Sequence, residues 1–152
     1  GERMPNKSDE ALMLDNQLCF QLYSVSRTMT KLYQPLLKPL GLTYPQYLVM
    51  LVLWEMPMGH KHTVTTLGRK LRLDSGTLTP LLKRLEAKRM IQRRRSQVDE
   101  RQVWVRLTGL GESLKQQAKR VPQKLLAASN SSAEEAASVR STLRSLLASL
   151  DG

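Results

Sequence analysis

The chain has 152 residues, of which 41% are hydrophobic and 24% charged, and its formal net charge is +11. This size and apolar fraction suit one domain with a core and exclude a disordered tail protein. No apolar run approaches the roughly 18 residues that span a bilayer, no signal-peptide pattern opens the chain, and one cysteine cannot form an internal disulfide, so we expect a cytoplasmic protein with no membrane partner.

The first third of the chain is predicted to be helical. Apolar residues recur at steps of three and four, which is the helical period, at Leu14, Leu18, Leu22, Val25, Met29, Leu32 and Leu36. Two prolines distort or end this helix, and Gly41 closes it. A second helix is predicted from Thr43, which can cap it, to about Met56, and it is apolar nearly all round, so we expect it to be central. The loop at 56–63 has no assigned function.

Two short helices, a hairpin and two longer helices are predicted to follow. The short helices span 64–71 and 73–89, and leucines line one face of the second. Residues 90–108 alternate with a period of two around a polar stretch, which indicates two strands joined at a hairpin tip. The last helices are expected at 108–128 and 132–150. An apolar seam runs along the final helix at Ala136, Val139, Leu143, Leu146 and Leu150.

The basic charge is concentrated in the middle of the chain. Residues 61–106 carry 13 Lys and Arg against 4 Asp and Glu, whereas residues 1–60 are neutral and residues 107–152 have a net charge of +2. Such a segment favours a polyanion, and nucleic acid over an anionic membrane. Two short helices followed by a basic hairpin are typical of a winged helix-turn-helix, so the predicted fold is mainly α with a small β-hairpin wing.

The predicted DNA contacts come from the 73–89 helix and the wing. On the helix they are Ser75, Thr77, Thr79 and Lys83, and on the wing they are Arg93, Arg95, Asp99 and Arg101. An arginine at a wing tip can enter the minor groove while a neighbouring carboxylate orients it. Alternation places Arg94 on the opposite face of the strand. Pro80 fits only if the helix begins late, near Gly76 or Thr77.

The terminal helices are not needed for reading DNA, and they are predicted to hold two copies together. Helix-turn-helix proteins usually bind as dimers to half-sites about 34 Å apart. We therefore expect a homodimer on a pseudo-palindromic operator of double-stranded DNA. Three regions follow: an N-terminal sensor and dimerisation helix at 1–40, a winged helix-turn-helix at 41–108, and C-terminal dimerisation helices at 109–152.

The residue types alone do not predict a reactive centre. Cys19 borders the apolar stripe between Leu18 and Leu22, and a lone cysteine at such a position is ordinarily a small buried hydrophobic residue. His60 and His62 lack a third ligand, so we expect them in a solvated loop and predict no metal and no cofactor.

Four segments resemble the MarR-type winged-helix repressors, and within them the organic-hydroperoxide-sensing (OhrR) branch. They read LDNQLCFQLYS at 14–24, LTYPQYLVMLVLWE at 42–55, the 73–108 stretch and its wing signature DER at 99–101. The wing signature is shared by the superfamily, whereas the cysteine string followed by LTYPQY marks the branch. The C-terminal third matches only in its helical pattern.

The resemblance implies that Cys19 is a redox sensor whose thiolate reacts with an organic hydroperoxide, the inducer, to give a sulfenic acid. It also implies that Tyr23, Tyr33 and Tyr44 surround the sulfur and donate hydrogen bonds that favour the thiolate. Tyr33 is 14 residues beyond Cys19, about 21 Å along a helix, so it could reach only the Cys19 of a partner subunit. Ala127 stands where two-cysteine members have a resolving cysteine, so a small-molecule thiol would form a mixed disulfide.

Three functions remain open. The favoured one is a repressor that releases its operator when Cys19 is oxidised. The alternative is a MarR-type repressor released by a small aromatic ligand, with Cys19 inert. An enzyme, a one-cysteine peroxidase, is disfavoured because it would need neither the basic segment nor the wing.

Overall fold

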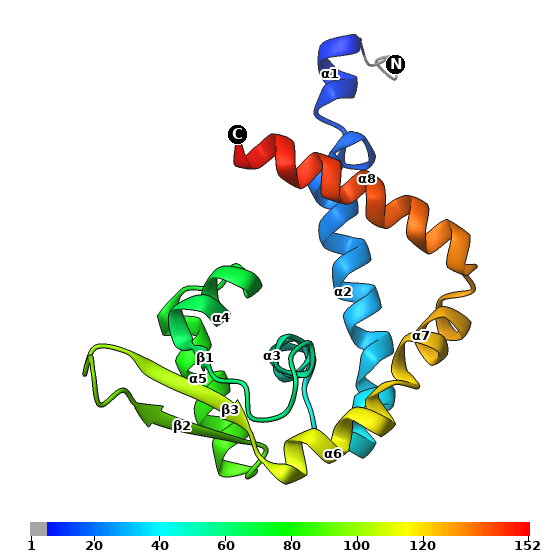
Figure 1. Cartoon of the computed structure of the whole chain (residues 1–152). Coiled ribbons are helices and arrows are strands. Elements are labelled where there is room, and N and C mark those ends of the chain that lie inside the picture. Colours follow the sequence, from blue (N-terminus) through cyan, green and yellow to red (C-terminus); the bar gives the residue numbers. More distant parts are fainter. Residues whose placement is uncertain (1–5) are drawn as a thin grey trace.

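The computed structural model describes residues 6–152, and they form a mainly helical chain with one small antiparallel sheet (Figure 1). Helix α3 (Tyr44–Trp54) lies between two groups of elements. On one side are α4 (Val64–Leu71), α5 (Ser75–Ala87) and the sheet, and on the other are α2 (Leu18–Leu37) and the C-terminal helices. The architecture is that of a winged helix-turn-helix with long terminal helices, as the sequence predicts.

The first long helix begins later than its apolar pattern predicts. The short helix α1 (Lys7–Ala11) and the 3-10 turn η1 (Leu14–Asn16) precede α2, which starts at Leu18 and not at Leu14. Gln17 separates them because its backbone is extended, with φ −93° and ψ 117°, and its side-chain amide donates to the carbonyls of Ala11 and Met13. Pro35 lies inside the last turn of α2 and does not end it.

A short 3-10 turn, η2 (Lys38–Leu40), leads from α2 to the buried helix α3. Gly41 closes the turn with φ +70°, which a residue with a Cβ adopts only with strain. Thr43 then caps α3, as predicted, and Gln46 completes a reciprocal capping box. Seven of the eleven residues of α3 are buried, so its predicted central position is confirmed, although it ends at Trp54 and not at Met56. The Trp54 indole N–H donates to the Gly111 carbonyl at 3.0 Å and ties the core to the C-terminal region.

The sheet has a third strand that the sequence pattern missed. Strands β2 (Ile91–Arg95) and β3 (Val103–Leu107) form the predicted hairpin, and β1 (His62–Thr63), at the end of the 56–63 loop, pairs with β3 in the order β1-β3-β2. A two-residue strand is too short to show an alternation, so no period could reveal it.

Helix α5 begins two residues later than the predicted 73, but one residue before the start near Gly76 or Thr77 that Pro80 was expected to require. Asp74 caps the helix and Ser75 is its first residue, which leaves Pro80 in the interior. The ring lies on the exposed face, opposite the buried Leu78 and Leu82. The carbonyl that loses its hydrogen bond belongs to Gly76, which is also exposed, so water can replace the missing donor.

The helix predicted at 108–128 is two helices, α6 (Gly109–Ala118) and α7 (Val121–Ser129). Pro122 explains the break, because its ring would clash with the carbonyl four residues earlier, at Ala118. The last helix, α8 (Ala133–Asp151), has no buried residue, and apolar side chains remain exposed along it at Val139, Leu143, Leu147 and Leu150.

Among residues 6–152 no single helix has the length and apolar character to cross a membrane; only the bent pair Leu18–Leu40 and Tyr44–Trp54, which meets at 67°, satisfies those criteria together.

Candidate functional site

Cys19 is the second residue of α2 and is exposed in the single chain, so it is not the buried packing residue that periodicity alone favours. The backbone N–H groups of Leu18, Cys19 and Phe20 find no acceptor among the described residues, because Gln17 provides no side-chain cap. Free N–H groups at a helix N-terminus favour a nearby anion. Tyr23 follows one turn later and is 61% exposed, with the Arg27 guanidinium 5.1 Å from its ring centroid.

Three tyrosines form a cluster at the other end of α2. The ring centroid of Tyr33 lies 4.7 Å from that of Tyr44 and 5.6 Å from that of Tyr47. Burial, and then the two neighbouring phenols, raise the pKa of Tyr33 to about 12, and burial also raises the pKa of Tyr44. The phenols of this cluster therefore keep their protons at neutral pH and remain hydrogen-bond donors. Tyr47 is 3% exposed and belongs to the core.

Within one chain, the predicted sensor residues lie in two separate groups. Cys19 and Tyr33 lie in the same uninterrupted helix, 14 residues apart, which corresponds to about 21 Å. Tyr23 is on the Cys19 side and Tyr44 stacks on Tyr33, so neither Tyr33 nor Tyr44 can contact the sulfur of its own chain. The apolar surface around Cys19 is also uncovered, since Leu14, Leu18 and Val25 are exposed by 58%, 59% and 54%.

The position expected for a resolving thiol is on α7, which packs against α2. It is occupied by Ala127, which is exposed. A hollow of about 520 Å³ lies nearby between α2 and the end of α7, lined by Val25, Met29 and Ala128 among others. Cys19 therefore has no second thiol within its own chain.

Helix α5 presents the predicted DNA-reading side chains. Ser75, Thr77 and Lys83 are exposed, whereas Thr79 is partly buried, and the leucines face the core as predicted. The Asp74 carboxylate accepts from the Thr77 N–H at 2.8 Å, and this hydrogen bond lowers the pKa of Asp74. Arg84 shares the exposed surface with Thr77, because the two residues are seven apart on the helix. The helical period could have identified Arg84 as well.

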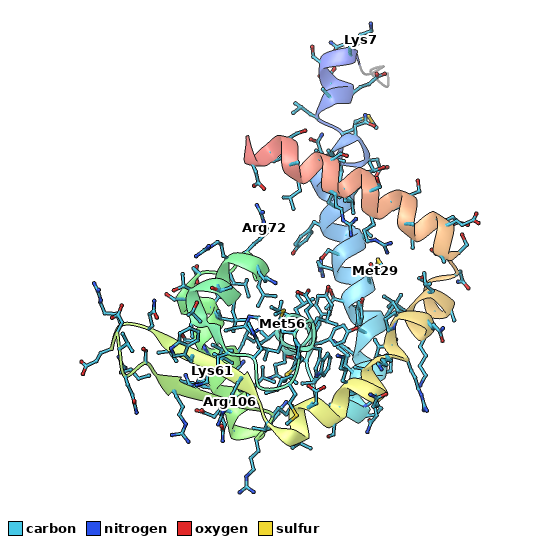
Figure 2. The ribbon with its side chains drawn as sticks, viewed as in Figure 1. Lys7, Met29, Met56, Lys61, Arg72 and Arg106 are labelled. Atoms are coloured by element: carbon cyan, nitrogen blue, oxygen red, sulfur yellow. The ribbon has the colours of Figure 1, made fainter. Side chains whose placement is uncertain are left out.

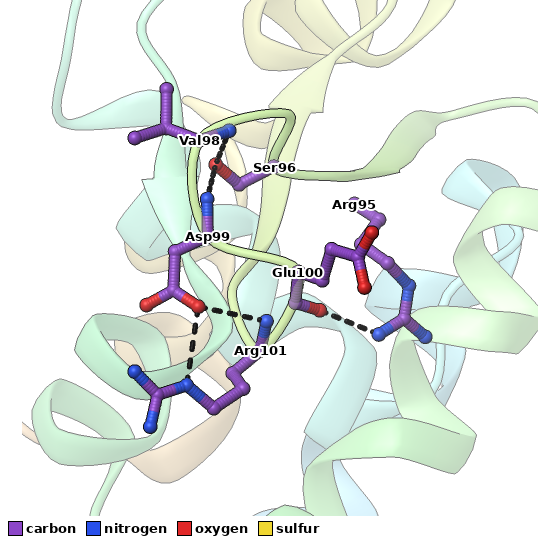
Figure 3. Close-up of polar contacts among 6 residues, drawn as sticks. All are labelled: Arg95, Ser96, Val98, Asp99, Glu100 and Arg101. Carbon is purple, nitrogen blue, oxygen red and sulfur yellow. Dashed lines mark hydrogen bonds and ion pairs between the residues drawn. The ribbon is translucent and has the colours of Figure 1, made fainter.

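The wing tip fixes the geometry of its terminal arginine (Figure 3). The Ser96 hydroxyl accepts from the N–H groups of Val98 and Asp99, which closes the turn. Asp99 Oδ1 accepts from the backbone N–H of Arg101 at 3.0 Å and from its Nε at 3.2 Å. The Arg101 side chain is 92% exposed, so the carboxylate orients a guanidinium that projects into solvent.

The other two predicted wing arginines make contacts within the chain. Arg93 donates to Glu86 of α5 through its backbone N–H at 2.9 Å and through its guanidinium at 3.0 and 3.2 Å. Burial opposes ionisation of Glu86, but these hydrogen bonds outweigh it, and its pKa lies below the ordinary value. Arg93 therefore connects the wing to α5. Only a contact with DNA was predicted for this residue. Arg95 donates to the Glu100 carbonyl at 2.6 Å across the hairpin and stays exposed.

A further ion pair connects the C-terminal end of α4 with the C-terminal end of α8. Arg72, the left-handed C-cap of α4, extends toward α8 and pairs with Asp151 through contacts of 2.6 and 3.0 Å (Figure 2). The guanidinium hydrogen bonds lower the pKa of Asp151. Both side chains are about half exposed, so the pair contributes little energy.

The two histidines differ in environment. His60 is exposed, but His62 is 5% exposed within β1, so the prediction of a solvated loop is wrong for His62. Its Nε2 is buried without a partner among the described residues, and burial, followed by the nearby His60 and Lys70, lowers its pKa. Residues 6–152 contain no group of three or more His, Cys, Asp or Glu side chains placed to hold a metal ion.

Comparison with known proteins gives consistent matches over nearly the whole chain. Residues 31–118 match the family described as transcriptional regulator SarA/Rot. The organic hydroperoxide resistance transcriptional regulator of Bacillus subtilis (strain 168) is 49% identical over 148 residues, which cover 97% of each chain. The reduced form of MarR from E. coli has a TM-score of 0.66 at 27% identity, covering 86% of this chain and 96% of that one.

AbfR of Staphylococcus epidermidis is similar in two DNA-bound structures. Reduced AbfR bound to DNA has a TM-score of 0.74 at 39% identity and covers 95% of this chain and 99% of that one. Overoxidized AbfR bound to DNA has a TM-score of 0.73 at 38% identity and covers 94% and 98%.

Proposed function

The chain belongs to the MarR-type winged-helix transcriptional regulators, in the group of the organic hydroperoxide resistance regulators, and we propose that it is a DNA-binding repressor that senses organic hydroperoxides through Cys19. The observation that carries the sensor role is the separation within α2. Cys19 is uncovered at one end, and the protonated, stacked Tyr33 and Tyr44 lie about 21 Å away at the other.

A homodimer explains this separation and the exposed apolar surfaces. Antiparallel α2 helices bring Cys19 of one subunit to Tyr33 and Tyr44 of the other, while Tyr23 stays beside Cys19 of its own chain. The exposed apolar side chains of the N-terminal region and of α8 then become the interface, since surfaces of this extent are uncommon on monomers. The regions 1–40 and 109–152 hold the dimer, and the region 41–108 binds the operator.

The DNA contacts follow from the exposed groups of α5 and the wing. Ser75, Thr77, Thr79 and Lys83 read or approach the major groove, and Arg101, oriented by Asp99, enters the minor groove. Arg95 contacts the backbone at the wing. Arg93 acts indirectly, because its ion pair with Glu86 sets the angle between the wing and α5.

The sensing step oxidises sulfur by two electrons. The Cys19 thiolate attacks one oxygen of the hydroperoxide, the S–O bond forms as the O–O bond breaks, and the alkoxide leaves and takes up a proton to become an alcohol. A small-molecule thiol then attacks the sulfenic sulfur, and the hydroxyl group leaves as water with the thiol proton, which gives a mixed disulfide. Ala127 cannot perform this second step.

The mixed disulfide is the species that we hold responsible for release. The overoxidized form of AbfR is bound to DNA in its crystal structure, so in that protein this form is compatible with a DNA complex. A bulky thiol adduct at Cys19 would also displace the partner's Tyr33 and Tyr44 and shift the spacing of the two α5 helices, which makes the dimer a two-state switch. The protein acts in the cytoplasm, where its DNA is, and it consumes peroxide once per cysteine and not as a catalyst.

Peroxide-induced release of operator DNA tests the proposal. We expect reduced wild-type protein to release its operator after one equivalent of organic hydroperoxide and a small thiol, with an intact-mass increase equal to one thiol adduct. The Cys19→Ser variant should bind equally well and stay bound. Release of both proteins by a small aromatic acid, with peroxide ineffective, would instead establish the ligand-gated alternative, and repeated turnover of peroxide would establish a peroxidase.

A further inference from the structure

The outer side of the wing sheet carries a basic surface that the proposed operator contacts do not use. Strand register places Arg94 opposite Trp104 and Gln92 opposite Arg106, and all four alternate away from the core-facing Val105. With Lys61, which precedes β1, these residues make up what we call the outer wing face. Lys61 and Arg106 lie next to each other on the sheet in Figure 2.

This face is hollowed and rich in hydrogen-bond donors. It lines a depression of about 670 Å³ that extends to the hairpin turn. Arg106 Nε donates to Gln92 Oε1 at 3.0 Å, which leaves the Gln92 amide N–H groups free to donate outward. The Trp104 indole is partly exposed on the central strand and also offers only a donor.

The positive charges of the outer wing face are not neutralised within the chain. None of Lys61, Arg94 and Arg106 forms an ion pair in the part of the chain that the structure describes. The carboxylate that borders the depression, Asp99, is already paired with Arg101. On the inner side, by contrast, Arg93 is paired with Glu86.

We propose that the outer wing face binds the phosphate backbone of DNA that continues past the operator half-site. This inference rests on the proposed function, because the wing tip must first hold the duplex. The face is continuous with that tip, and it spans three strands, or about 10 Å, which corresponds to about three base pairs of duplex. Cations and donors without free acceptors complement phosphate oxygens and carry no sequence preference. The occupant is therefore flanking duplex DNA, and the contact increases affinity without adding specificity.

Salt dependence on two duplexes tests this contact. Reduced protein first selects an operator from a pool of random duplexes, and binding is then measured on that operator alone and on the same operator with ten arbitrary base pairs added at each end. The Arg94→Gln/Arg106→Gln variant is compared with wild type, and Lys119→Gln/Arg120→Gln, which removes the same charge at the α6–α7 junction, is the matched control. Thermal melting confirms that each variant is folded.

Four phosphate contacts in a dimer, two from each subunit, change the slope of log affinity against log salt by about 3.6. We expect wild type and the control to lose at least about 150-fold more affinity on the long duplex than on the short one between 50 and 200 mM salt, and the Arg94/Arg106 variant to lose about 150-fold of this difference. Equal slopes for wild type on both duplexes would overturn the inference. It would also be overturned if the variant lost as much affinity on the short operator as on the long one.

The remaining outcomes separate this inference from the proposed function. Preference of the wild-type face for a single-stranded oligonucleotide, with equal slopes on the two duplexes, would assign the face to a different partner and overturn the inference alone. A protein that selects no duplex at all would overturn the proposed function, and the inference with it.

Discussion

The intersubunit origin of the sensor can be tested by placing its parts on different chains. In one heterodimer, the first subunit carries Cys19→Ser and the second carries Tyr33→Phe with Tyr44→Phe. Each phenylalanine keeps the ring and removes only the hydroxyl, so the stacking at 4.7 Å is preserved. This dimer has one Cys19, on the chain that lacks the two phenols. This Cys19 therefore reacts fast only if the tyrosines of the other chain donate hydrogen bonds to its sulfur.

The size of the effect follows from the hydrogen bonds that are lost. A hydrogen bond to a charged group contributes about 1.5–3 kcal/mol, so removing one phenol donor from the reacting thiolate slows it by about 10- to 150-fold. Within a chain, the 14 residues between Cys19 and Tyr33 correspond to a rise of about 21 Å along the helix, far beyond hydrogen-bond distance. Tyr33 and Tyr44 of the same chain can therefore contribute nothing to the reaction rate.

The matched control carries all three changes on one subunit, paired with wild type. Its only Cys19 lies on the chain that retains the phenols, so the intersubunit arrangement predicts slow oxidation there and fast oxidation in the first heterodimer. Differently tagged subunits allow each heterodimer to be purified, and stopped-flow loss of the free thiol gives the rates. The reverse order, fast in the control and slow in the split dimer, would refute the composite sensor.

Four other outcomes test the fold and the assembly. Gly111→Ala should lower the free energy of unfolding by about 2–3 kcal/mol, because a Cβ there would lie 2.1 Å from the Met90 carbonyl oxygen, whereas Gly109→Ala, with open space, should be close to neutral in urea denaturation. Glu86→Gln should weaken the dependence of the unfolding free energy on pH in acid. The folded pKa of Glu86 lies below 4.5, so its contribution to stability is present above pH 4.5 and is lost as pH falls through the folded pKa. His62→Gln should remove a loss of stability that begins below pH 6.5, because the unfolded chain protonates His62 more readily than the folded chain does. Unchanged pH profiles of the two variants in thermal melts would contradict the roles given to Glu86 and His62. Leu143→Lys should convert the dimer to monomer in sedimentation velocity, and a dimer of unchanged affinity would exclude α8 from the interface.

Elements with strong local signals were predictable from the sequence. The capping box at Thr43, the leucine face of α5 and the alternation of the wing each rest on neighbours within a few residues, and the structure has all three. Boundaries that depend on tertiary contacts were not predictable. The late start of α2 depends on amide hydrogen bonds from Gln17, and β1 exists only because β3 lies beside it.

For the candidate site, the sequence led to a set of residues that stays a prediction, and the contacts that these residues make were not predictable. The resemblance implied Cys19 and the tyrosines, and helical geometry alone separated Tyr33 from the cysteine. The pairing of Arg93 with Glu86 joins residues seven apart in different elements, and no periodicity indicates it. The same holds for the burial of His62, which is set by the sheet.

The proposed sensor and the proposed DNA-reading helix are connected by direct contacts in this chain. Tyr44, which the partner's Cys19 would meet, is the first residue of α3 and lies next to its capping box. Gln46 of that box accepts from Lys88 Nζ at 2.8 Å, and Lys88 is the C-cap of α5 and also donates to the Gly41 carbonyl. An adduct that displaces Tyr44 therefore strains the start of α3 and the end of α5 together. The leucine face of α5 is packed in the core, with Leu78, Leu82 and Leu85 almost fully buried. The displacement is therefore more easily accommodated by moving α5 as a unit than by bending it, and a shift of the two α5 helices changes the spacing that an operator reads.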